Sequence, residues 1–217
     1  MIDQIKYLIL KEFKLELRNK YALGGILLYV VSTVFVSYLS FKKIIVPATW
    51  NALFWIILLF ASINGVAKSF IGETRGRLLY MYTLASPQAV IISKIIYNSI
   101  LLLVISGLCL LVYSLFVGSL IQDIPLFLIV LTLGSFGFAS LLTMVSAIAS
   151  KSNNNFTLMA ILSFPILMPL LIVLIKLSKN AIDGLENWDL NYLMVLMFIN
   201  VIIIALSYLL FRYLWRD

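Results

Sequence analysis

The sequence is poor in groups that carry out chemistry: it contains no histidine, a single cysteine and few charged residues. Charged residues make up 12% of the chain, against about 25% in soluble domains. Without histidine the chain lacks a His-based zinc site, a histidine general base and a histidine ligand for iron. The lone cysteine, Cys109, excludes an intrachain disulfide, and its place in a long apolar run indicates packing.

Two further absences narrow the functional classes. No glycine-rich phosphate loop of the Walker type is present, so this chain does not hydrolyse ATP by that route. The middle of every long apolar run lacks ionisable residues, which transporters driven by protons or sodium commonly use at membrane depth. We therefore expect any powered movement to draw on a partner. An enzyme is the least favoured class, because histidine is absent and the carboxylates are confined to loops. A carboxylate pair within residues 183–189 is the one alternative, and a solvated cap is favoured there.

Apolar residues are what the sequence has in abundance. Hydrophobic residues make up 63% of the 217 residues, and the mean hydropathy is +1.10. Because a helix needs about 20 apolar residues to cross a bilayer, six such helices nearly exhaust the length. The sequence predicts an all-α integral membrane protein with one domain over residues 1–217. The predicted spans are 21–39, 48–67, 89–117, 125–149, 156–175 and 192–211.

The first twenty residues have a different pattern from the spans. Apolar residues recur three or four positions apart, while lysines, an arginine and a glutamine occupy the opposite side. This spacing predicts an amphipathic helix over residues 1–20 that lies in the membrane interface. A plain solvated extension is the alternative. Beyond the fifth span, residues 176–191 are predicted to form a short external cap with Trp188 at headgroup level.

The distribution of lysine and arginine predicts the orientation. Four of the sixteen lie in connections on one side, and the other twelve lie on the side that also holds both termini. Since positive charge collects on the cytoplasmic side, both termini are expected there. The net charge of +7 then reflects topology and anionic lipid headgroups, with no need for nucleic acid. The twelve are Lys6, Lys11, Lys14, Arg18, Lys20, Lys68, Arg75, Arg77, Lys94, Lys151, Arg212 and Arg216.

Two spans carry patterns with a structural and a functional interpretation. In the fourth, Ser135, Ala139 and Thr143 stand four apart, which favours close helix packing over a substrate-lining role. In the fifth, Pro165 and Pro169 lie one turn apart and remove two helix hydrogen bonds. The proline pair indicates either a fixed kink or a hinge beside a pathway.

The connection between the second and third spans, residues 68–90, is longer than joining them requires. It mixes charged, apolar and glycine residues, a composition that suits docking of a partner protein. A headgroup-level loop held by arginines is the alternative. The predicted docking surface comprises Phe70, Glu73, Arg75, Gly76, Arg77 and Leu78.

At these residues the sequence resembles the heme exporter protein B (CcmB) family. The resemblance is carried by Phe70, Glu73, Gly76 and Leu78, by Ser86-Pro87 and Lys94, and by the six spans with Pro165 and Pro169. It extends over nearly the whole chain, and residues 68–94 are its most specific part. The resemblance implies a membrane permease subunit of the ABC-type complex of cytochrome c maturation, with an ABC-2-like exporter fold.

The resemblance also implies partners and a location. A cytoplasmic ATPase would bind ATP and dock on residues 68–90, which would act as a coupling segment. A tryptophan-rich heme-handling membrane subunit and a heme chaperone would complete the complex, with heme as a possible substrate and the permease as a dimer. The location implied is the bacterial inner membrane. Two alternatives remain: an export permease for another hydrophobic or lipid-like substrate, and a non-transporting scaffold of a heme-delivery complex.

Overall fold

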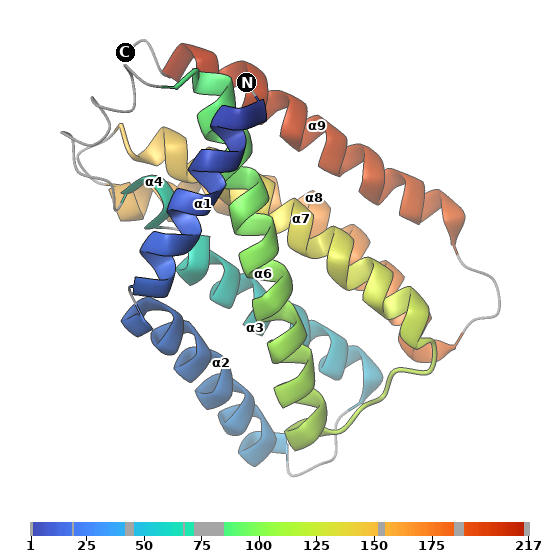
Figure 1. Cartoon of the computed structure of the whole chain (residues 1–217). Coiled ribbons are helices and arrows are strands. Elements are labelled where there is room, and N and C mark those ends of the chain that lie inside the picture. The colour runs from blue at the N-terminus through green and yellow to red at the C-terminus, as the bar shows by residue number, and fades with distance from the viewer. Residues whose placement is uncertain are drawn as a thin grey trace.

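The computed structural model describes residues 2–18, 20–41, 46–66, 68–71, 85–151, 155–184 and 189–214. These residues form eight helices and no strand. In chain order (Figure 1) the helices are α1 (Ile2–Arg18), α2 (Lys20–Phe41), α3 (Pro47–Val66), α4 (Lys68–Ile71), α6 (Pro87–Val117), α7 (Ile124–Ala149), α8 (Asn155–Asp183) and α9 (Leu190–Leu214).

Six helices of the described chain, α2, α3 and α6 to α9, are long and apolar enough to cross a membrane. Each covers one predicted span, so the all-α membrane fold is confirmed. The largest boundary difference is in α8, which runs to Asp183 instead of ending near residue 175. The residue that follows α8 is Gly184, and its φ of +66° is a left-handed conformation that favours glycine and stops the helix. The first part of the predicted external cap, residues 176–183, is therefore the last part of α8.

Helix α7 lies at the centre of the bundle. It contacts α3, α4, α6, α8 and α9, and its Ser135, Ala139 and Thr143 are fully buried. A Cβ atom added at Gly134 would lie 3.0 Å from the Trp55 ring, and one at Gly137 would lie 2.9 Å from Leu170. Neighbouring helices thus approach α7 across its small residues, which confirms the packing interpretation of this face.

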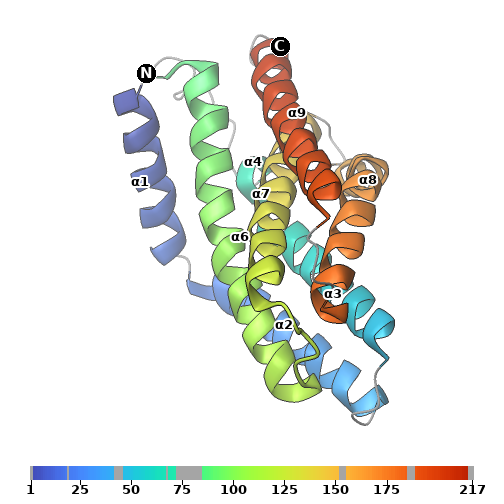
Figure 2. The same ribbon diagram turned by 90° about the vertical axis from the view of Figure 1, so that its right-hand side faces the viewer.

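The amphipathic helix α1 runs parallel to the first half of α6 (Figures 1 and 2). The Ser86 hydroxyl lies 3.4 Å from the Gln4 side-chain oxygen, and further along, the Phe13 and Tyr97 rings meet edge to face at 5.2 Å. The helical stripe predicted for residues 2–20 therefore packs partly on α6. The first turns of α1 and α6 and the last turn of α9 lie at one end of the bundle.

The other end of the bundle is fixed by aromatic and amide side chains. Trp50 on α3 donates from Nε1 to the carbonyl oxygen of Gly118 at 2.8 Å, and Tyr113 on α6 donates to the carbonyl oxygen of Trp50 at 3.1 Å. Ser178 on α8 donates to Asn51 Oδ1 and accepts from Trp55 Nε1, both at 2.8 Å. These buried polar groups tie α3 to α6 and α8.

Candidate functional site

A buried cation lies where the connection between α4 and α6 begins. Lys94, in the second turn of α6, is 1% exposed, and its Nζ lies 3.3 Å from Oε1 of Glu12 on α1. The same ammonium donates to the carbonyl oxygen of Ser69 and lies 4.7 Å from the centre of the Phe70 ring. A carboxylate, a carbonyl and an aromatic face together offset the cost of removing the charge from water.

One turn further along α6, an amide extends this contact into the bundle. Asn98 donates from Nδ2 to Ser69 Oγ at 3.0 Å and to Thr143 Oγ1 on α7 at 2.7 Å. Thr143 in turn donates to the carbonyl oxygen of Ala139 within its own helix. We call this set the Lys94 node, and its members are Glu12, Ser69, Phe70, Lys94, Asn98 and Thr143.

Phe70 is anchored on both its backbone and its ring. Its N–H donates to Ser146 Oγ on α7 at 3.3 Å, and its ring lies 5.4 Å from that of Phe211 on α9. The side chain is 3% exposed and belongs to a small apolar cluster with Val90, Ile91, Ile95, Ala147 and Phe211. Phe70 therefore fixes the start of the connection to α6, α7 and α9.

The far end of the same connection is also fixed to α6. Ser86 caps the helix, accepting at Oγ from the N–H of Ala89 at 3.4 Å, and Pro87 occupies the first turn. A serine cap followed by proline is a favoured start for a helix, because the side chain satisfies a free N–H and proline lacks one. The described residues on the two sides of the connection are thus held at the Lys94 node and at Ser86, and both points touch α1.

The predicted docking surface is only partly within the described chain. Phe70 is buried in the apolar cluster above, while Glu73, Arg75, Gly76, Arg77 and Leu78 lie outside the described residues. Docking of a partner at residues 68–90 stays a prediction.

The predicted hinge lies within the described chain. Pro165 and Pro169 are exposed and stand inside α8, which is assigned as one helix across both. Whether they form a fixed kink or a moving hinge also stays a prediction.

Glu12 is the functional candidate that the sequence pattern did not reveal. It was absent from the apolar stripe of residues 2–20, yet it lies on the side of α1 that packs on α6, beside Phe13. The available signal was twofold: Glu12 is one position from a stripe residue, and Lys94 stands in an otherwise apolar run. A charge placed near the start of a span requires a partner, and only the fold shows which carboxylate supplies it.

The contacts around Lys94 join helices to one another. Among the described residues no group of three or more His, Cys, Asp or Glu side chains is placed to hold a metal ion. The Lys94 node instead connects α1, α4, α6 and α7 through hydrogen bonds, an ion pair and a ring contact. These contacts hold the end of α4 in a fixed position against the other three helices.

Comparison with known proteins gives one match. The sequence profile described as CcmB protein matches residues 3–210, and no curated protein or solved structure matches significantly. The matched region includes five of the six candidate spans in full, α9 as far as residue 210, and every member of the Lys94 node. The chain therefore belongs to the CcmB family, whose members are membrane permease subunits, not ATPases, of the ABC system of heme export and cytochrome c maturation.

Proposed function

We propose that this chain couples ATP hydrolysis by a separate cytoplasmic ATPase to heme export or to release of a heme-loaded chaperone. Residues 72–84 dock the ATPase, and Glu73, Arg75, Gly76, Arg77 and Leu78 supply the contact surface. Family membership supports the permease role. ATP binds the partner subunit, and heme is a substrate of the complex.

The observation that carries the coupling proposal is the fixing of both ends of this connection to α6. At its start, Ser69 and Phe70 are held by Lys94 on α6, by Ser146 on α7 and by Phe211 on α9. At its end, Ser86 caps α6 directly. A displacement of residues 72–84 by a closing ATPase is therefore passed to three spanning helices at once.

The proposed orientation and partners follow from charge and family. The end of the bundle that holds both termini and the Lys94 node faces the cytoplasm, because the sequence assigns twelve of the sixteen lysines and arginines to the termini and connections of that side. The membrane is the bacterial inner membrane, and the permease works as a dimer. A tryptophan-rich heme-handling membrane subunit and a heme chaperone complete the complex.

The first experiment identifies the partners. The tagged chain is extracted gently from native membranes, and stoichiometric partners are identified by mass spectrometry. An ATPase together with a tryptophan-rich membrane subunit is the expected result. An ATPase alone would overturn the heme role and leave an export permease for another substrate. Recovery of neither would overturn the permease complex altogether.

The second experiment tests coupling with matched variants. Lys94→Met is expected to insert normally but to lower covalent heme attachment to a reporter cytochrome c. Gly76→Trp acts on the proposed docking surface and is expected to lower ATPase recovery while membrane insertion stays normal. Lys176→Met is the control, since this exposed lysine contacts Tyr192 at the other end of the bundle. Normal cytochrome c maturation with both test variants would overturn coupling, and lost maturation with normal ATPase recovery and turnover would count against a passive scaffold.

A further inference from the structure

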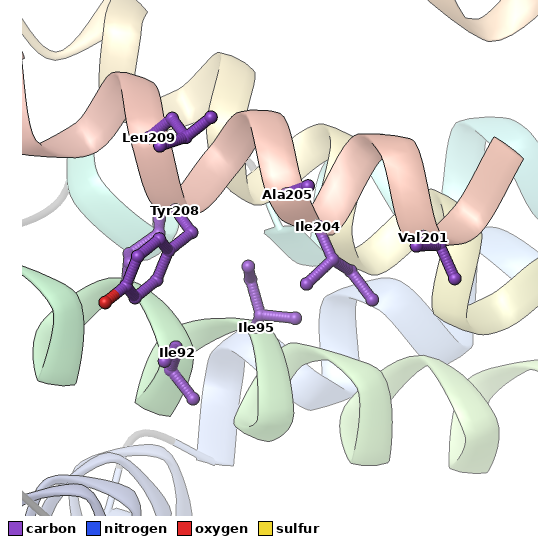
Figure 3. A pocket seen from close by; sticks show the side chains of 8 residues that line it. Ile92, Ile95, Val201, Ile204, Ala205, Tyr208 and Leu209 are labelled. Carbon is purple, nitrogen blue, oxygen red and sulfur yellow. The ribbon is translucent and has the colours of Figure 1, made fainter. Parts of the chain in front are cut away.

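An apolar groove runs between α6 and α9. It has a volume of about 510 Å³ and lies between the helices along their membrane-spanning lengths. Ile91 and Ile95 form part of the buried floor, while the α9 residues that line it are exposed. Figure 3 shows the Tyr208 ring reaching from α9 towards α6, close to Ile92. The lining residues are Ile91, Ile92, Ile95, Val201, Ile204, Ala205, Tyr208 and Leu209.

Polar residues continue the lining of the groove at one of its ends. The α9 lining positions 201, 204, 205, 208 and 209 form one helical stripe, and Arg212, one turn beyond Tyr208, continues it. On α6 the lining positions 91, 92 and 95 are preceded by Gln88, one turn nearer the helix start. Because α6 starts where α9 ends, both polar residues stand at the same end of the groove.

We propose that this groove binds an anionic phospholipid, with one acyl chain between α6 and α9 and its phosphate at Arg212 and Gln88. An apolar cleft that ends in a guanidinium and an amide matches an amphiphile with a negative headgroup. The Tyr208 hydroxyl supplies a third polar atom between the two zones. A spanning helix from a second copy would be apolar over this depth and would leave Arg212 unmatched.

The test uses the complete chain in phosphatidylcholine vesicles that contain a minority of phosphatidylglycerol. Each lipid is supplied in turn with a photoactivatable group on its acyl chain, and labelled peptides are mapped by mass spectrometry. Labelling is expected on the α6 and α9 segments that line the groove, and more strongly from phosphatidylglycerol. Arg212→Gln is expected to lower this preference roughly five-fold, the factor that corresponds to about 1 kcal/mol for one basic residue near a membrane surface.

Two further variants separate the groove from the general surface of α9. Ala205→Trp fills the groove and is expected to abolish its labelling by both lipids. Ile202→Trp adds the same ring at an exposed position of α9 outside the lining and is expected to leave labelling unchanged. Thermal denaturation of each variant in detergent confirms that it is folded.

Three outcomes would overturn the assignment. Equal labelling from both lipids, unaffected by Arg212→Gln, would remove the anionic headgroup site. Labels distributed evenly around α9 would mean ordinary bilayer contact. Efficient disulfide formation between two copies carrying Val201→Cys would place a second copy of the chain in the groove instead.

Discussion

Lys94 Nζ on α6 lies 3.3 Å from Glu12 Oε1 on α1, which pairs the amphipathic helix with a spanning helix through a buried charge. The side chain of Lys94 is 2% exposed and that of Glu12 is 14% exposed. Water therefore screens this pair far less than a surface ion pair. The contact makes α1 part of the bundle and gives it a share in positioning the connection that follows α4.

Removal of the Lys94 charge is expected to destabilise the protein more than removal of the Glu12 charge. Lys94→Met leaves the Ser69 carbonyl without its cation and leaves Glu12 with Lys11 alone, whose Nζ also lies 3.3 Å from Glu12 Oε1. Loss of one partner from a buried pair costs about 3–5 kcal/mol, and the remaining Lys11 contact places the expected loss at the lower end of that range. Glu12→Gln costs less, because Lys94 keeps the Ser69 carbonyl and the Phe70 ring. The Tm of the detergent-solubilised protein measures both, and the double variant is expected to lose less than the sum of the two. Strict additivity would show that the pair is not coupled.

The amide link from α6 to α7 predicts a smaller effect. Thr143→Val removes the acceptor that lies 2.7 Å from Asn98 Nδ2, and hydrogen bonds of this kind in membranes contribute about 0.6–1.7 kcal/mol. Thr132→Val is the matched control, since this exposed hydroxyl bonds only the carbonyl of Ile129 in its own helix. The comparison is made by thermal denaturation. An equal loss in both variants would argue against the link between helices.

Close packing at α7 makes glycine substitutions site-dependent. Gly134→Ala places a Cβ 3.0 Å from the Trp55 ring, whose Nε1 is held by Ser178, so a loss of about 1–3 kcal/mol is expected. At Gly107 on α6 no neighbouring atom lies within 4 Å, and alanine there is expected to stabilise by about 0.5–1 kcal/mol. Opposite Tm shifts of the two variants are the result to look for. Shifts of the same sign would contradict the packing geometry.

The hydrogen bonds of Ser178 are expected to stabilise the end of the bundle that lies away from the Lys94 node. Ser178→Ala leaves Asn51 Oδ1 without its donor and Trp55 Nε1 without its acceptor, and a buried unsatisfied group costs about 1–3 kcal/mol. A change in the intrinsic tryptophan fluorescence is expected as well, because the Trp55 hydrogen bond is lost. Ser40→Ala, at an exposed serine bonded only to the carbonyl of Val36, controls for loss of a hydroxyl. An unchanged Tm for Ser178→Ala would refute this hydrogen-bond role.

Replacing the proline pair of α8 tests whether it forms a fixed kink or a moving hinge. Pro165→Ala combined with Pro169→Ala returns two N–H donors to the helix and leaves no cavity, since both rings are exposed. The Tm is expected to rise. Cytochrome c maturation measured in the same variant distinguishes the two interpretations, because it stays normal for a fixed kink and falls for a hinge. A lower Tm would mean that the prolines fit a conformation that a regular helix does not adopt.

Hydropathy predicted the six spans because backbone N–H and C=O groups in lipid must be hydrogen-bonded within their own segment. A long apolar run therefore forms a helix. Hydropathy misplaced the end of α8 because leaving the membrane does not end a helix; Gly184 does. The partner of Lys94 could not be predicted, since the pairing depends on α1 lying parallel to α6. Phe70 was expected on a docking surface, but its burial against Phe211 depends on how α9 returns to α4.

Helix α6 is held at two levels, by the Lys94 node near its start and, near its end, by the hydrogen bond from the Tyr113 hydroxyl to the Trp50 carbonyl of α3. The nineteen helical steps from Lys94 to Tyr113 correspond to about 28 Å of helix, close to the roughly 30 Å of the hydrocarbon core. With fixed points at both ends of this length, any displacement of α6 must either break one of the two sets of contacts or carry the neighbouring helices with it.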